Sequence, residues 1–215
     1  MVRDAARGDE GARGLFVSAY LGVVRAYLGA RWRGARLIDR LDDAVQDVFL
    51  ECFRDAGALE RLDNTRGSSF RTFLYGVVRN VGRRYEERVG LGREVNPPSG
   101  FDVDAGDESL SLVFDRLWAQ AVLDRAGERQ RARAEMNGAQ GLRRLELLHL
   151  RFVKGLPVRE IAAQWKADAA VLHEELRKAR KEFKEALREE VRFHLSGPGE
   201  AVDRECLRLL SLLEH

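Results

Sequence analysis

The chain has 215 residues, of which 45% are hydrophobic and 33% charged, and its formal net charge is +2. This balance is typical of a globular chain with its own core and excludes a disordered chain. No apolar run approaches the length of a membrane span, and Cys52 and Cys206 lie too far apart to indicate a disulfide framework. We therefore expect a cytoplasmic protein without membrane insertion.

Charge is distributed unevenly along the chain. Residues 37–63 carry eight acids and three bases, residues 66–93 carry seven arginines and two acids, and residues 94–111 carry five acids and no base. Blocks of alternating sign suggest several surfaces with different partners.

The first two expected helices span residues 15–33 and 41–55. The apolar residues of the first recur at helical spacing: Phe16, Tyr20, Val23, Val24, Tyr27 and Leu28. Those of the second form one stripe: Val45, Val48, Phe49, Cys52 and Phe53. The opposite face of the second helix carries Asp43, Gln46, Asp47, Leu50 and Arg54. An ordinary solvated face is the simplest interpretation, and a metal site at Asp43 and Asp47 lacks a third ligand.

The stretch "SSFRTFLYGVVRNVGRRYEER" predicts a third helix, with Ser69 as a candidate N-cap. Its apolar stripe consists of Phe73, Leu74, Val77, Val78, Val81 and Tyr85. Its other face carries Arg71, Tyr75, Arg79 and Arg83, flanked by Asn80 and Arg84. Guanidinium groups bind phosphates and rings stack on bases, so this face favours nucleic-acid binding. The alternative is a solvated face that is paired locally with Glu86 and Glu87.

The second half of the chain predicts further helices. Residues 90–109 contain Pro97, Pro98, glycines and acids, which indicates a linker. Helical pattern resumes at about residue 110, and a short helix, a tight turn and a long basic helix follow within residues 142–190. A leucine-rich segment after residues 196–199 predicts a terminal helix. The expected fold is all-α, with two small helical domains, an acidic linker and a C-terminal helix.

Patterns typical of catalysis are missing from the sequence. There is no phosphate-binding glycine-rich loop with a lysine, no G-x-S-x-G and no H-E-x-x-H. The four histidines are scattered along the chain. We expect a protein that is not an enzyme and that uses no cofactor and no metal.

Three segments together resemble a known family: "DDAVQDVFLECFR", "SSFRTFLYGVVRNVGRRYEER" and "EIAAQW" followed by "VLHEELRKAR". They are similar to bacterial RNA polymerase sigma factors of the extracytoplasmic-function (ECF) group. The acidic motif of that family is matched by Asp42, Asp43, Gln46, Asp47 and Phe49. Its second motif is matched by Phe70, Phe73, Leu74, Tyr75 and Asn80, with Phe73 in place of a tryptophan. The long helix after the linker and the leucine-rich tail resemble a planctomycete-type variant.

The resemblance implies a division of the chain. Residues 1–89 would form a sigma region 2-like domain, and residues 90–109 an acidic flexible linker that threads the RNA path of the polymerase. Residues 110–195 would form a region 4-like helix-turn-helix domain with its preceding long helix, and residues 196–215 a C-terminal helical extension. Core RNA polymerase and promoter DNA are the implied partners of a chain that is monomeric when free. Whether an anti-sigma factor also binds stays open.

The resemblance also implies two functional surfaces in the first domain. The clamp helices of the polymerase would contact Asp43, Gln46, Asp47, Leu50 and Arg54. The −10 promoter element would be recognised and melted by Asn64, Arg66, Ser68, Phe70, Arg71, Arg79, Asn80, Arg83 and Arg84. Melting requires a pocket for an extruded base and cations for the backbone.

The implied −35 contacts in the second domain are His173, Glu174, Arg177, Lys178 and Lys181. Here Glu174 and Glu175 stand where the family usually has small polar or basic residues, and glutamate repels phosphate. Lys166 stands at a turn where the family often has glycine, at a cost of about 1 kcal/mol if φ is positive. Two alternatives therefore remain: a helix-turn-helix regulator that acts without polymerase, and a sigma-like adaptor with weakened promoter binding.

Overall fold

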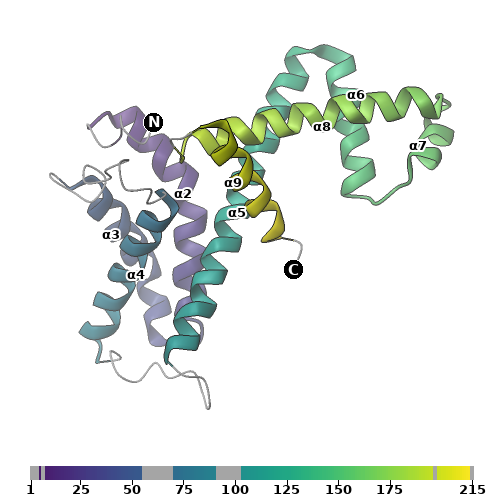
Figure 1. The fold of residues 1–215 in the computed structure, drawn as a ribbon. Coiled ribbons are helices and arrows are strands. Elements are labelled where there is room, and N and C mark those ends of the chain that lie inside the picture. Colours follow the sequence, from purple (N-terminus) through teal and green to yellow (C-terminus); the bar gives the residue numbers. More distant parts are fainter. Residues whose placement is uncertain (1–4, 6–7, 55–69, 91–102, 196–197, 214–215) are drawn as a thin grey trace. The chain divides into compact units, whose positions relative to one another are not determined.

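A computed structural model describes residue 5 and residues 8–54, 70–90, 103–195 and 198–213, with side chains left undescribed at residues 103–109. The described residues are helical and contain no strand, which confirms the all-α prediction (Figure 1). None of the described helices combines the length and apolarity needed to cross a membrane. The helices gather into two compact units, residues 1–121 with 193–215 and residues 122–192.

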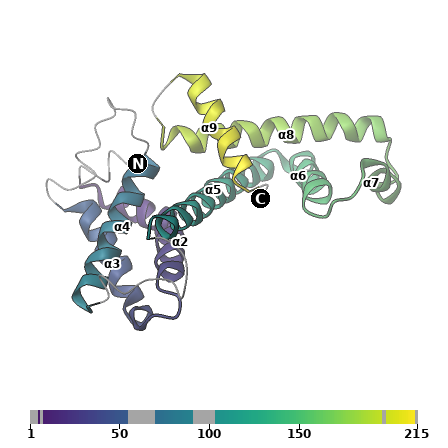
Figure 2. The ribbon, with the colours of Figure 1, turned by 60° about the horizontal axis from the view of Figure 1, so that its bottom comes forward.

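Unit 1 is built on three helices that pack against one another: α2 (Glu10–Arg31), α3 (Leu41–Phe53) and α4 (Phe70–Arg88). Asp9 caps α2 by accepting a hydrogen bond from the Ala12 amide, and a 3₁₀ turn, η1 (Arg36–Arg40), leads into α3. Figure 2 shows the three helices side by side. Every residue of the predicted α2 stripe is buried. The helical period of the apolar residues therefore determined which face of α2 packs inward.

The core of unit 1 is completed by α5 (Val103–Met136) and the chain around His194. Phe114 and Trp118 of α5 are buried, and Trp118 stacks on Tyr20 with ring centroids 5.3 Å apart. The Tyr20 hydroxyl lies 2.8 Å from Nδ1 of His194. α9 (Gly199–Ser211) buries Val202, Cys206 and Leu209, and its Arg208 lies 3.8 Å from Asp115 of α5. The aromatic core of this unit therefore includes helices that follow the predicted linker.

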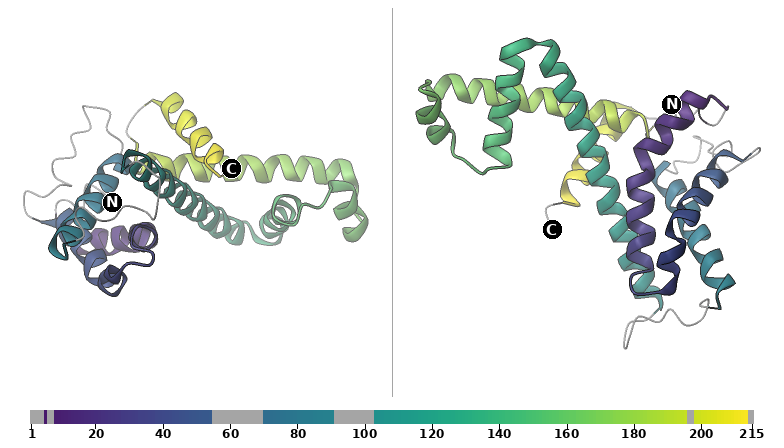
Figure 3. Two further views of the ribbon diagram at one scale, coloured as in Figure 1. Left: turned by 90° about the horizontal axis from the view of Figure 1, so that it is seen from below. Right: turned by 180° about the vertical axis from the view of Figure 1, so that it is seen from behind.

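Unit 2 contains the rest of α5 together with α6 (Gly138–Phe152), α7 (Val158–Trp165) and α8 (Ala169–Arg192). α6 and α7 both pack on α8, with α7 beside the N-terminal end of α8 (Figure 3). Their apolar core consists of Leu147, Val158, Ile161, Ala162, Leu172 and Leu176. The predicted order of short helix, turn and long helix is present. Its use in DNA binding remains a prediction.

The compact units divide the chain at positions other than those expected from the sequence. Residues 110–121 and 193–215 belong to unit 1, whereas the sequence grouped most of them with the second domain or with a separate extension. α5 also begins at Val103, inside the expected linker. The physical reason is burial, because Phe114, Trp118 and Leu209 become buried within unit 1.

Candidate nucleic-acid interface

The outward face of α3 presents the side chains that the sequence singled out. Asp43, Gln46, Leu50 and Arg54 are exposed, and Leu50 retains 59% of its surface. They lie opposite the buried stripe of α3 because residues three and four positions apart share a helix face. Among the described residues, Arg40 lies 3.3 Å from Asp43 and Arg54 lies 4.0 Å from Glu51, and exposed pairs of this kind are weak. A single exposed leucine is common on protein surfaces, and its role in docking remains a prediction.

Asp47 differs from its neighbours on this face because it is half-buried. Its carboxylate accepts a 2.8 Å hydrogen bond from the Tyr85 hydroxyl of α4. Burial raises the pKa of Tyr85 to about 12, and the hydrogen bond to Asp47 adds to that rise. Asp47 therefore joins α3 to α4 in addition to lying on the outward face.

The outward face of α4 carries the basic residues. Arg79, Asn80, Arg83 and Arg84 are exposed. Arg83 lies 3.4 Å from Glu87, one turn further along, and Arg84 lies 3.4 Å from Glu51 of α3. Exposed pairs of this kind are worth about 0–1 kcal/mol, so a phosphate competes with them readily. The face can thus bind an anionic backbone without disrupting the core.

A buried ion pair fixes the basic helix to α2. Arg31 donates to both Glu86 oxygens at 2.6 and 2.8 Å, and the Trp32 indole nitrogen donates to Glu86 at 3.0 Å. Burial lowers the pKa of Arg31, but the hydrogen bonds and charge of Glu86 outweigh it and raise the pKa overall. The alternative interpretation of the sequence paired Glu86 with the arginines of a solvated face. Glu86 lies instead on the inward side of α4. In the sequence, its position directly after Tyr85, the last residue of the predicted apolar stripe, was the one feature that indicated burial.

Residues 16–88 match the Sigma-70 region 2 family.

The match spans α2, α3 and α4, and no curated protein that was compared matches the chain. A region 2 domain supports a sigma-factor role in promoter recognition by RNA polymerase. Both outward faces described above belong to this region 2 segment. The match ends before α5, although α5 contributes Phe114 and Trp118 to the same core.

Two residues of the predicted −10 set lie inward within the region 2 segment. Phe70 is only 2% exposed, and its ring packs near Phe16 and Trp118. Arg71 is half-buried and forms an ion pair with Asp115 of α5. The resemblance placed Phe70 in the −10 set, and the sequence pattern placed Arg71 on the outer face, because neither revealed that α5 covers this end of α4.

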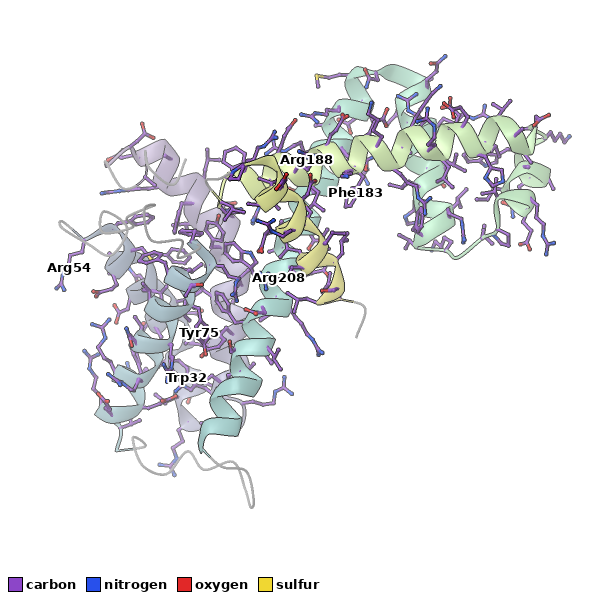
Figure 4. The ribbon with its side chains drawn as sticks, in the orientation of Figure 1. Trp32, Arg54, Tyr75, Phe183, Arg188 and Arg208 are labelled. Atoms are coloured by element: carbon purple, nitrogen blue, oxygen red, sulfur yellow. The ribbon has the colours of Figure 1, made fainter. Side chains whose placement is uncertain are left out.

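The other residues of the −10 set fall into two groups, those within the described residues and those outside them. Asn64, Arg66 and Ser68 lie outside the described residues. Tyr75, which the sequence grouped with the arginines, is half-buried, and its ring lies 5.2 Å from Phe114 and 5.8 Å from Tyr27. Figure 4 shows Tyr75 and Trp32 within the bundle and Arg54 at its edge. The basic face that remains consists of Arg79, Asn80, Arg83 and Arg84.

All five predicted −35 residues are exposed on α8: His173, Glu174, Arg177, Lys178 and Lys181. The three cations among them are each paired with a glutamate on the same helix. Arg177 donates twice to Glu174, at 2.8 and 2.7 Å, and this contact lowers the pKa of Glu174. Lys178 lies 3.3 Å from Glu175, and Lys181 lies 3.9 Å from Glu185. DNA would have to displace these pairs.

Proposed function

We propose that this chain is a sigma factor of the ECF type, which brings core RNA polymerase to promoters and opens them at the −10 element. The observation that carries this proposal is the region 2 match across residues 16–88. It is supported by two exposed faces of opposite character on adjacent helices of that segment, one acidic on α3 and one basic on α4. A duplex-binding regulator without polymerase has no use for the exposed α3 face.

The α3 face is the proposed docking surface for the polymerase. Leu50 would enter an apolar contact at its centre, and Asp43, Gln46 and Arg54 would form polar contacts around it. This arrangement is supported by the exposure of all four side chains. An apolar centre with a polar rim is the usual composition of a protein interface.

The α4 face is the proposed −10 surface. Arg79, Arg83 and Arg84 would neutralise backbone phosphates, and Asn80 would hydrogen-bond a base edge. The predicted pocket residues Asn64, Arg66 and Ser68 remain part of the proposal, and Phe70 does not because it is buried. The helix would hold its position during melting because the Arg31–Glu86 ion pair anchors it from behind.

The −35 contacts of α8 are proposed to be weak. Support comes from the glutamates that already hold Arg177, Lys178 and Lys181. The same pairs favour the second candidate function, a sigma-like adaptor that binds polymerase but not promoter DNA. Transcription by reconstituted polymerase separates the two, because the adaptor yields no new transcript 5′ ends.

Docking is tested by co-purification of core polymerase with the Asp47→Arg variant. We expect loss of binding, because an arginine reverses the charge on the α3 face. The matched control is Tyr85→Phe, which removes the same hydrogen bond to Asp47 but leaves its carboxylate in place. Unchanged binding by Asp47→Arg would contradict the docking assignment, and equal loss in Tyr85→Phe would assign Asp47 a structural role only.

Promoter contact is tested by combining Arg79→Ala with Arg83→Ala. Binding of the holoenzyme to promoter DNA should weaken, and the slope of log K against log salt should fall by about 2. Ser111→Ala, a half-buried position on α5, serves as a control that removes no charge. A salt slope equal to wild type would place both arginines away from DNA.

A further inference from the structure

The two halves of α4 differ in what covers them. On the first half, Arg71 and Tyr75 are half-buried. On the second half, Arg79 and Arg83 are exposed, although all four residues share one side of the helix because they recur every fourth position. The first half is covered by three residues of α5, which we call the α5 cover: Phe114, Asp115 and Trp118. The basic side of α4 is therefore open along its second half only.

Aromatic contacts hold the α5 cover in place within unit 1. The Phe114 ring lies 5.2 Å from the Tyr75 ring, and the Trp118 ring lies 5.7 Å from the Phe70 ring. Phe114 and Trp118 are both buried. Asp115 lies between them in the sequence, so the packing of its neighbours brings its carboxylate to Arg71.

The carboxylate of Asp115 is committed to Arg71. The two side chains form an ion pair and retain only 15% and 23% of their surface, respectively. Arg208 of α9 lies 3.8 Å from the same carboxylate, but it donates to both oxygens of Glu205 at 2.8 and 2.7 Å. Because Glu205 already holds Arg208, the charge of Asp115 chiefly serves Arg71.

The ion pair leaves part of the Arg71 guanidinium unused. Asp115 accepts a hydrogen bond from Nη1 of Arg71, whereas Nε of Arg71 is buried and has no hydrogen-bond partner among the described residues. A buried donor without an acceptor is unfavourable. A guanidinium can donate two parallel hydrogen bonds to a phosphate, so a phosphate would satisfy Arg71 better than this single contact does.

We propose that the α5 cover is an autoinhibitory element, in which Asp115 occupies Arg71 in place of a nucleic-acid phosphate. Phe114 and Trp118 hold the carboxylate there in the free chain. The inference rests on the proposed function of α4 as the −10 surface. Asp115 and a phosphate are both anions with acceptor oxygens, so Arg71 can serve one or the other. Release of α5 from this end of α4 would add Arg71 to the exposed basic residues.

The test measures binding of the full chain, without polymerase, to a fluorescein-labelled DNA duplex that has a central unpaired stretch. Anisotropy over a salt series gives the slope of log K against log salt. Asp115→Asn should tighten binding and steepen this slope by about 1, because Arg71 gains a phosphate. Arg71→Gln alone should leave the slope unchanged, because this arginine is withheld in the wild type. Combining Arg71→Gln with Asp115→Asn should abolish the gain.

The matched control is Asp39→Asn, which removes the same charge from an exposed position in η1. Its slope should stay near the wild-type value. An unchanged slope in Asp115→Asn, an equal rise in Asp39→Asn, or a fall in Arg71→Gln alone would overturn the proposal. Circular dichroism checks that each variant keeps its helical content. If Asp115→Asn loses helical content, Arg71→Gln alone decides, since a fall in its slope would show that Arg71 already contacts DNA.

The same assay separates this inference from the proposed function. Arg79→Ala combined with Arg83→Ala should flatten the salt slope if α4 is the −10 surface. A flatter slope in that variant with no gain in Asp115→Asn would leave the −10 surface in place and overturn autoinhibition. An unchanged slope in the arginine variant would contradict the −10 surface itself, whatever Asp115→Asn does.

Discussion

At the scale of single residues, Lys166 has an unfavourable backbone conformation at the turn between α7 and α8. Its backbone is left-handed, with φ 49° and ψ 45°, and no other non-glycine residue in the described segments has a positive φ. The Cβ atom makes this conformation unfavourable by about 1 kcal/mol or more, because it lies too close to the following carbonyl oxygen. The turn still forms because its backbone amides are hydrogen-bonded. The Ala167 amide donates to the Ala162 carbonyl, and the Lys166 amide donates to the Ala163 carbonyl.

Lys166→Gly should therefore stabilise unit 2. We expect a gain of roughly 0.5 kcal/mol in the free energy of unfolding, since relief of strain exceeds the added entropy of the unfolded chain. Urea unfolding followed by circular dichroism measures it. Lys166→Ala is the control, because it removes the charge and keeps Cβ. A gain of equal size in Lys166→Ala would show that charge, and not backbone strain, is responsible.

At the scale of helices, the position of the basic face depends on one buried contact between α2 and α4. Glu86 is buried and accepts hydrogen bonds from Arg31 and from Trp32. Loss of one member of a buried pair leaves the other charge uncompensated. The arginines of α4 are thus held outward by a carboxylate on the reverse side of the same helix.

Glu86→Gln should destabilise unit 1 by about 3 kcal/mol, because the Arg31 charge stays buried without a counter-charge. The free energy of unfolding in urea, followed by tryptophan fluorescence, tests this. The neighbouring Glu87→Gln is the matched control. Glu87 is exposed and pairs with Arg83 at 3.4 Å, so we expect a change of about 0.5 kcal/mol or less. Similar losses in both variants would contradict a special role for Glu86.

At the scale of the whole chain, the region 2 segment depends on residues beyond its family match. Trp118 of α5 stacks on Tyr20 of α2, and both rings lie near His194. Asp115 of α5 pairs with Arg71 of α4, and Arg208 of α9 lies 3.8 Å from the same carboxylate (Figure 4). Segments on both sides of unit 2 in the sequence therefore complete unit 1.

Trp118→Ala should destabilise unit 1 by about 3–5 kcal/mol, because it leaves a cavity against α2 and α4. Leu112→Ala on the same helix is the control, since Leu112 is 51% exposed and should cost well under 1 kcal/mol. Thermal unfolding of the full chain compares them. A small effect of Trp118→Ala would mean that residues 16–88 hold their fold without α5.

The sequence by itself determined the all-α class and the faces of α2, α3 and α4, because apolar period and helix geometry are local properties. Of its acidic and basic outward residues on α3 and α4, most are exposed as predicted, whereas Asp47 and Arg71 are half-buried. Only the tertiary structure decided which charges are internal. Arg71, Glu86 and Glu175 are charged residues in helical patterns, and nothing local distinguishes them from solvated ones. Their partners Asp115, Arg31 and Arg144 lie on other helices. Only the packing of those helices therefore shows that these three charges are paired inside the protein.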